Sequence, residues 1–311
     1  PIQILVDALR DLGASIEYLE KDGYPPLKIT GKKITNSFVK INGNVSSQYI
    51  SALMLIAPSL PNGLKIELIG KITSVPYINM TLKLLHQLNI EAKFEGQTIK
   101  IESKSTVRNQ TVVVESDWSS ASYFYSLIAL SKIGSSVTLS AYKKDSLQGD
   151  NCLAEIYRHF GVQTVFNENS IVLSKVKTYQ TEVLKVDLKN APDIAQTITV
   201  TCFGLGVACD LSGLHTLKIK ETDRLEALKI ELTKLGAHIE VTNESLHLKT
   251  SEEIKKNIAI ETYNDHRMAM AFAPLALKVL IQILDSEVVS KSYRNFWDDM
   301  QQVGLETVKV K

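Results

Sequence analysis

The sequence predicts an α/β protein built from repeated units, each with a buried helix, an outer helix and short strands between them. Two interleaved series of helix patterns support this prediction, and both recur with a period of about 74 residues. The third observation is the length of 311 residues, which exceeds one typical hydrophobic core and predicts two domains.

The outer helices are predicted from five amphipathic segments that each end in a leucine-glycine-like stop. The stops begin at Leu12, Leu88, Phe160, Leu235 and Val303, at spacings of 76, 72, 75 and 68 residues. Glycine follows in four of them, as a left-handed C-cap requires, and asparagine is the usual substitute in the fifth. Alternating residues after each stop, as at 15–19 and 238–241, predict short strands.

The buried helices are predicted from four segments that begin with small or polar residues and then become apolar nearly all round. Their starts lie at Ser46, Ser119, Pro192 and Asp265, each 73 residues after the one before. A helix that is apolar on every side is expected to be buried. Its polar start must then face solvent or a cleft, and Arg267 beside such a start requires an anionic partner.

Residues 220–224 place two cations and two carboxylates directly ahead of an outer helix. Asp223 is a predicted N-cap, with Glu226 completing a capping box. Lys220, Glu221 and Arg224 then lie at the positive end of a helix dipole, where anions bind. This favours a phosphorylated or carboxylated substrate with acid–base chemistry beside it. The alternative is a capped surface helix with solvated charges.

Composition excludes several classes of function. The 35 lysines and arginines nearly balance 34 acids, which argues against a nucleic-acid-binding surface over the whole protein. The chain contains no uninterrupted apolar run of about 18 residues, so no membrane span is expected. Cys152, Cys202 and Cys209 are odd in number and lack metal-site spacing, which favours reduced thiols and a cytoplasmic protein.

Seven segments, in order along the chain, resemble those of the EPSP synthase (3-phosphoshikimate 1-carboxyvinyltransferase) family. The last two are highly specific together, whereas the serine segments would be weak alone. The segments are Val45-Ser46-Ser47-Gln48, Pro76-Tyr77-Ile78, Ser119-Ser120-Ala121-Ser122-Tyr123-Phe124, Gln148-Gly149-Asp150, Ala191-Pro192-Asp193, Lys220-Glu221-Thr222-Asp223-Arg224 and Asn264-Asp265-His266-Arg267-Met268-Ala269-Met270.

The resemblance implies the two-domain enolpyruvyl transferase fold, with three α/β units in each domain and the active site between the domains. Residues 1–115 would form about one and a half units of an incomplete N-terminal domain, and residues 116–311 the three units of the C-terminal domain. Four buried and five outer helices, against six of each in the family, predict that about 110 residues precede Pro1 in the family pattern.

The implied reaction transfers the enolpyruvyl group of phosphoenolpyruvate to the 5-hydroxyl of shikimate 3-phosphate and releases phosphate. It implies no cofactor and no metal, no nucleic-acid or membrane partner, and a monomer at full length. The 311-residue chain alone is expected to be impaired, because substrate-binding residues of the family would be missing. Two alternatives are a related nucleotide-sugar enolpyruvyl transferase and a non-catalytic ligand-binding scaffold.

The resemblance also implies a role for each matching residue. Asp193, Glu221 and Lys220 would be catalytic, and Asp193 would take the proton of the 5-hydroxyl. Which of Glu221, Lys220 and Lys291 transfers the proton at the methylene carbon is left open. Shikimate 3-phosphate would be bound by Ser46, Ser47, Gln48, Ser74, Tyr77, Asp193 and Lys220. Phosphoenolpyruvate would be bound by Arg224, Arg267 and Lys291, with His266 beside them.

Overall fold

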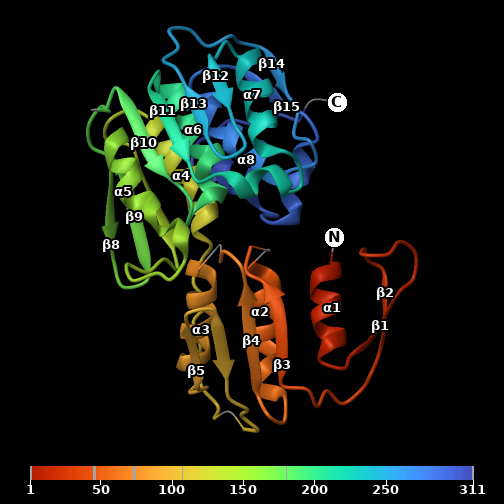
Figure 1. Ribbon diagram of the computed structural model, residues 1–311. Coiled ribbons are helices and arrows are strands. Elements are labelled where there is room, and N and C mark those ends of the chain that lie inside the picture. The colour runs from red at the N-terminus through yellow and green to blue at the C-terminus, as the bar shows by residue number, and fades with distance from the viewer. Residues whose placement is uncertain (1, 45–46, 73–74, 107, 180, 310–311) are drawn as a thin grey trace. The chain divides into compact units, whose positions relative to one another are not determined.

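The computed structural model describes residues 2–44, 47–72, 75–106, 108–179 and 181–309, and it has the mixed α/β fold that the sequence predicts. The chain divides into two compact units, Pro1–Val113 and Val114–Lys311 (Figure 1). The predicted boundary, after residue 115, lies two residues further along the chain. None of the helices formed by the described residues is long and apolar enough to cross a membrane.

Unit 1 is a four-stranded sheet covered by helices, preceded by a separate two-stranded hairpin. The sheet order is β3-β4-β6-β5, with β3 parallel to β4 and the other pairs antiparallel. In chain order the elements are α1 (Gln3–Asp11), β1 (Ser15–Tyr18), β2 (Leu27–Thr30), β3 (Phe38–Asn42), α2 (Ser47–Ile56), β4 (Leu64–Ile69), α3 (Val75–Gln87), β5 (Ala92–Glu95) and β6 (Thr98–Ile101).

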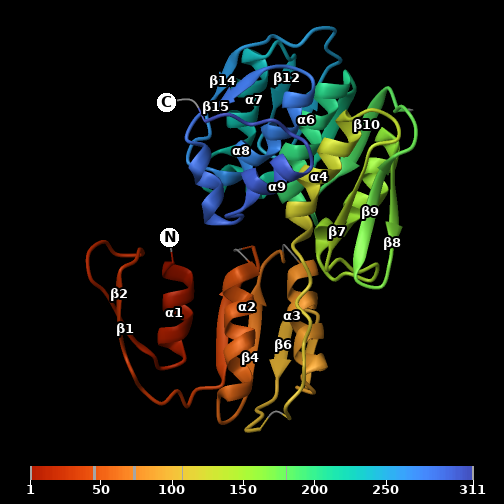
Figure 2. The same cartoon turned by 180° about the vertical axis from the view of Figure 1, so that it is seen from behind.

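The core of unit 1 lies between the sheet and the helices α1, α2 and α3, of which α2 and α3 lie side by side (Figures 1 and 2). Side chains of β4 alternate between buried and more exposed, as a half-buried strand requires. The prediction that α2 is buried on every side is wrong. Only Ile50, Leu53 and Met54 are buried, and Leu55 is 60% exposed, because the sheet and α3 cover only part of this apolar helix.

Unit 2 packs three helices into its centre and surrounds them with short strands and outer helices (Figure 2). The central helices are α4 (Trp118–Leu130), α6 (Ala195–Leu205) and α8 (His266–Phe272), and the outer ones are α5 (Leu153–Ile156), α7 (Arg224–Lys234) and α9 (Phe296–Gln302). Helix α6 contacts both α4 and α8. Nearly every residue of these three helices is buried, as their all-round apolar patterns predict.

The strands of unit 2 form three sheets. The first has the order β7-β9-β8, from β7 (Ser136–Ser140), β8 (Val162–Phe166) and β9 (Ser170–Lys175). The second has the order β10-β11-β13-β12, from β10 (Val183–Asp187), β11 (Ala208–Ser212), β12 (Ile239–Val241) and β13 (Leu246–Leu248). A parallel pair, β14 (Ile258–Ile260) and β15 (Ile281–Ile283), forms the third.

The internal repeat is visible in this topology. The sheet β10-β11-β13-β12 has the same order and the same parallel and antiparallel pairings as β3-β4-β6-β5 in unit 1. All five predicted helix stops are followed by a residue with positive φ, between 57° and 103°, as the left-handed C-cap requires. These residues are Gly13, Asn89, Gly161, Gly236 and Gly304.

Candidate functional site

The polar starts of the three central helices of unit 2 meet at one place. Asp117 caps α4 by accepting from Ser119 N at 3.0 Å, and Asp265 caps α8 by accepting from Arg267 N at 2.9 Å. Asp193 lies in the 3₁₀ turn η4 (Pro192–Ile194) that leads into α6. Arg267 connects the three starts, because its Nη2 donates to Ser119 Oγ at 3.3 Å and to Asp193 Oδ2 at 3.5 Å.

Arg224, the first residue of α7, is a second arginine at this place and is fully buried. Asp223 caps α7 by accepting from Glu226 N at 3.2 Å, as predicted. The Arg224 guanidinium donates from Nε to Asp265 at 2.6 Å, from Nη1 to Asp193 at 2.9 Å and from Nη2 to Glu221 at 2.7 Å. Three carboxylates therefore compensate one buried cation and tie the start of α7 to η4 and α8.

Asp193 is surrounded by cations. Its Oδ1 lies 2.9 Å from Arg224 Nη1 and 3.4 Å from Lys220 Nζ, and its Oδ2 lies 3.5 Å from Arg267 Nη2. Burial of Asp193 raises its pKa, but Arg267, Lys220 and Arg224 together outweigh that effect and lower the pKa to about 2. The carboxylate is therefore ionised at neutral pH.

His266 and Lys291 border the same cluster. His266 Nδ1 lies 3.9 Å from Glu221 Oε1, which is too far for a hydrogen bond, and burial lowers the pKa of this imidazole. Lys291 Nζ donates to Asn264 O at 2.7 Å, so the amine lies next to the segment that leads into α8. His266 and Lys291 thus add an imidazole and an amine at the border of the cluster.

The segment before α8 is held by a buried carboxylate in the middle of α7. Glu231 accepts from Tyr263 Oη at 2.7 Å and from Glu261 N at 3.1 Å, and it pairs with Lys234 at 2.8 Å. Tyr263 and the next residue both have φ near +55°, a backbone conformation that residues other than glycine rarely adopt. Helix α7 thereby positions both Arg224 at its start and the loop that carries Asp265 and Arg267.

We call Asp193, Lys220, Glu221, Arg224, Asp265 and Arg267 the carboxylate–arginine cluster. It brings together the predicted site residues of unit 2, with His266 and Lys291 at its border. The predicted residues of unit 1 belong to helix starts: Ser47 and Gln48 begin α2, and Tyr77 is the third residue of α3. Ser46 and Ser74 lie outside the described residues.

Three buried residues of the site were not predicted. Asp265 was interpreted only as the start of a central helix, yet it is the closest partner of Arg224. Ser119 was interpreted only as the start of a buried helix and Asp150 only as part of a segment that resembles the family, yet Ser119 Oγ accepts from Arg267 and donates to Asp150. The signal that could have identified Ser119 and Asp265 is their shared place at starts spaced by the repeat, where Asp193 was assigned a role.

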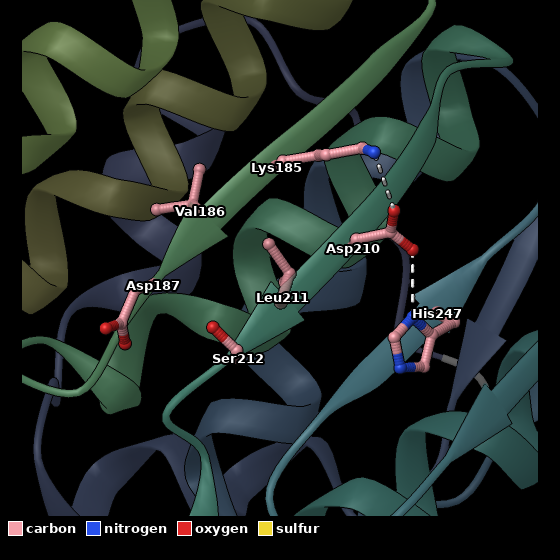
Figure 3. A pocket seen from close by; sticks show the side chains of 7 residues that line it. All are labelled: Lys185, Val186, Asp187, Asp210, Leu211, Ser212 and His247. Atoms are coloured by element: carbon pink, nitrogen blue, oxygen red, sulfur yellow. Dashed lines mark hydrogen bonds and ion pairs between the residues drawn. The ribbon is translucent and has the colours of Figure 1, made fainter.

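A different polar group lies on the exposed face of the sheet β10-β11-β13-β12 (Figure 3). Ser245 Oγ lies 3.0 Å from His247 Nε2, and His247 Nδ1 lies 2.8 Å from Asp210 Oδ1, as in a serine–histidine–aspartate triad. The N–H groups of Glu244 and Ser245 both donate to Thr242 Oγ1, so neither can stabilise an oxyanion. His247 and Asp210 are nearly half exposed, and this group is not a candidate active site.

Among the described residues, no group of three or more histidines, cysteines or carboxylates has a geometry that could hold a metal ion. The carboxylate–arginine cluster instead alternates anions with nitrogen cations, an arrangement suited to carboxylate and phosphate groups.

Comparison with known proteins identifies the family. The family model for EPSP synthase (3-phosphoshikimate 1-carboxyvinyltransferase) matches residues 1–300. A 3-phosphoshikimate 1-carboxyvinyltransferase of Bacteroides fragilis is 46% identical over 309 residues, which are 98% of this chain and 75% of that protein. One from Haemophilus influenzae strain PittEE is 35% identical over 309 residues, 98% of this chain and 70% of that protein.

The fold is also that of a solved structure of EPSP synthase from Acinetobacter baumannii. The TM-score is 0.79 at 21% identity, and the match covers 98% of this chain and 71% of that one. At this identity the structural match supports the fold, whereas the family model and the sequence relatives establish membership. The chain belongs to the EPSP synthase family.

Proposed function

We propose that this chain supplies the acid–base and anion-binding groups that transfer the enolpyruvyl group of phosphoenolpyruvate to the 5-hydroxyl of shikimate 3-phosphate. The observation that carries the proposal is the carboxylate–arginine cluster, together with the activity named in the relatives. The cluster holds three cations and three carboxylates in direct contact with one another. The cations provide fixed positive charge for an anionic substrate, and a carboxylate beside them provides a base.

The reaction needs three proton transfers. The 5-hydroxyl oxygen adds to the enol carbon while its own proton leaves and the methylene carbon gains one, which gives a tetrahedral intermediate. Loss of phosphate, with loss of a proton from the new methyl group, then restores the double bond. Together the two substrates carry two carboxylates and two phosphates, so cations must be present in the proposed site at every stage.

Asp193 is the proposed acceptor of the hydroxyl proton. With a pKa of about 2 it is a weak base while Arg267, Lys220 and Arg224 surround it. Anionic substrate groups compete with Asp193 for the same cations. Binding of both substrates therefore raises the pKa of Asp193 towards its usual range and strengthens it as a base.

The remaining roles follow the contacts of each residue. Arg224, Arg267 and Lys291 are proposed to bind phosphoenolpyruvate, and Lys220, with Ser46, Ser47, Gln48, Ser74 and Tyr77, is proposed to bind shikimate 3-phosphate. Glu221 is the proposed donor and acceptor for the methylene carbon. Its side chain is 39% exposed, which makes Glu221 the most accessible of the three carboxylates that pair with Arg224.

The experiment measures phosphate release and enolpyruvyl product from phosphoenolpyruvate and shikimate 3-phosphate, in the full-length protein that carries this chain. Asp193→Ala should lower kcat at least a hundredfold, the lower range for loss of a general base. Asp210→Ala, which removes an exposed carboxylate of β11, is the matched control and should retain full activity. Full activity of Asp193→Ala would refute the assignment of the base.

The acceptor is tested by competition. Shikimate 3-phosphate and a nucleotide sugar are supplied together with limiting phosphoenolpyruvate, and the product of each is quantified. Product from shikimate 3-phosphate alone supports the proposal, and product from the nucleotide sugar supports the related transferase instead. A full-length protein that consumes neither acceptor would favour the non-catalytic scaffold.

The proposal places the protein in the cytoplasm as a monomer at full length. The three cysteines are unpaired, and Cys202 and Cys209 are buried, which is consistent with a reducing compartment. Sedimentation of the full-length protein at assay concentration would test the monomer.

A further inference from the structure

Arg267 is held by longer hydrogen bonds than Arg224 at the same cluster, and its side chain is 14% exposed against 2% for Arg224. The hydrogen bonds of the Arg267 guanidinium measure 3.3 Å to Ser119 Oγ, 3.4 Å to Asp193 O and 3.5 Å to Asp193 Oδ2. Charge-assisted N–H···O bonds are about 2.7–2.9 Å long, the range in which Arg224 is held by Asp193 and Glu221. The orientation of the Arg267 guanidinium therefore depends on these longer, weaker hydrogen bonds to Ser119 and Asp193.

Among the described residues, Ser119 Oγ makes the shortest hydrogen bond with the Arg267 guanidinium, at 3.3 Å. A hydroxyl has a single proton and two acceptor lone pairs. Ser119 Oγ gives its proton to Asp150 Oδ2 in a short hydrogen bond between two buried side chains. Because that proton is directed at Asp150, the lone pairs of Ser119 Oγ are free to accept from Arg267 Nη2.

Asp150 is almost completely buried in the 3₁₀ turn η2 (Gly149–Cys152). Its second oxygen, Oδ1, makes no hydrogen bond with any described residue. A buried carboxylate with one unsatisfied oxygen is costly, so it is rarely kept for packing alone. Gln148 fixes the distance between η2 and α4, since its side chain accepts from Trp118 N and donates to Ser116 O, both at 2.8 Å.

We propose that Asp150 is a positioning residue that acts through Ser119 to direct the N–H groups of Arg267 towards an anionic group of the substrate. This inference rests on the proposed function, in which Arg267 binds phosphoenolpyruvate. Asp150 itself touches no substrate. Its charge orients the Ser119 hydroxyl, and the hydroxyl oxygen then holds one edge of the guanidinium.

We call the path from Asp150 through Ser119 to Arg267 the relay. The protonation state of Asp150 controls it. Burial raises the pKa of Asp150 to about 6, against the lowering effects of Ser119 and Arg267. The other charged groups that act on it are Asp193 of η4 and Asp117 at the start of α4, which both raise the pKa. Cys152 on the same turn is neutral, because burial raises its thiol pKa to about 12. Below about pH 6 a neutral Asp150 can donate to Ser119, which reverses the hydroxyl.

The test compares steady-state constants of the full-length wild type with those of Asp150→Asn, Ser119→Ala and the double variant. Asp150→Asn should raise KM for phosphoenolpyruvate about three- to tenfold at pH 7.5, the effect of losing one hydrogen bond, and leave KM for shikimate 3-phosphate unchanged. Ser119→Ala should give a similar increase, and the double variant should add nothing further, since both act on one path. Asp145→Asn, an exposed aspartate ahead of the same turn, is the matched control and should change neither constant.

The pH dependence of KM distinguishes the positioning role of Asp150 from a purely structural one. The ratio of the Asp150→Asn KM to the wild-type KM cancels the ionisation of the substrate itself. It should fall towards one as the pH drops below about 6, because neutral Asp150 then resembles asparagine. A ratio that is independent of pH, equal increases in both KM values, or additive single variants would each overturn the relay.

The relay and the proposed function fail in different ways. A wild type that turns over both substrates, with variants that keep the wild-type KM, overturns the relay and leaves the function standing. Calorimetric titration with phosphoenolpyruvate gives the same comparison as Kd ratios. A wild type that neither binds nor consumes phosphoenolpyruvate overturns the proposed function, and the relay with it.

Discussion

Asp265 is the buried carboxylate that joins two helix starts in unit 2, and its loss is expected to destabilise that unit. It accepts from Arg224 Nε at 2.6 Å and Nη2 at 3.3 Å, and it caps α8 by accepting from Arg267 N at 2.9 Å. Asp265→Ala removes all three bonds. Arg224 keeps Asp193 and Glu221, so its charge is not left uncompensated.

The magnitude follows from these contacts. A hydrogen bond to a charged group contributes about 1.5–3 kcal/mol, and a helix cap contributes about 1 kcal/mol. Asp265→Ala should therefore lower the free energy of unfolding by about 2.5–4 kcal/mol, which overlaps the range of about 3–5 kcal/mol for breaking a buried ion pair. Asp265→Asn retains the cap, because asparagine caps helices as well as aspartate, and should cost about 1.5–3 kcal/mol.

Tryptophan fluorescence during urea unfolding is the assay that isolates this effect. The chain has two tryptophans, Trp118 and Trp297, and both lie in unit 2. Asp298→Ala, an exposed first-turn position of α9, is the matched control, with an expected cost below about 1 kcal/mol. If Asp265→Ala shifts the urea midpoint no further than the control, the buried pair does not hold the unit together. If asparagine costs as much as alanine, the cap has no separate contribution.

Two further predictions use the same assay. Lys175 donates to Ala129 O and Phe160 O, and burial lowers its pKa to about 8 from 10.5. Between these two pKa values the unfolded chain binds more protons than the folded one, so Lys175 makes the free energy of unfolding rise as the pH increases from about 8 to 10.5. Over the same range, the free energy of unfolding of the wild type minus that of Lys175→Met should also rise. A pH-independent difference would contradict the buried amine. Gly161→Ala should destabilise more than Gly134→Ala, because both glycines have positive φ but only at Gly161 would a Cβ lie 2.0 Å from a carbonyl oxygen. Equal midpoints for the two variants would count against that close approach.

Helix ends were predictable from sequence because each carries its own local signal. The stops at Leu12, Leu88, Phe160, Leu235 and Val303 coincide with, or directly follow, the last residue of α1, α3, η3 (Tyr157–Phe160), α7 and α9. A residue that must adopt positive φ ends a helix whatever surrounds it. Burial is not local in this sense. The pattern of α2 encodes an apolar surface but not what covers it, so its exposed side was not predicted.

The site was predictable in its parts and not in its pairings. The spacing of the repeat places Ser119, Asp193 and Asp265 at equivalent helix starts, and these starts converge. Which arginine contacts which carboxylate depends on side-chain reach across three helices, a property with no sequence signal. Arg224 and Arg267 were therefore assigned one role, to bind phosphoenolpyruvate, while the structure gives them different surroundings.

The donors of the two arginines separate their roles. A guanidinium has five N–H groups. Arg224 gives its Nε–H, both Nη2 N–H groups and one Nη1 N–H group to carboxylates of the described residues, which leaves a single donor. Towards the described residues, the Arg267 guanidinium donates only from Nη1 and Nη2, in long bonds to Ser119 and Asp193. An incoming anion can exchange with these weak partners at little cost, whereas at Arg224 it must displace a buried carboxylate. We therefore expect Arg267 to respond to substrate more readily than Arg224, which holds Asp193 and Asp265 in place and keeps one donor with which to bind phosphoenolpyruvate.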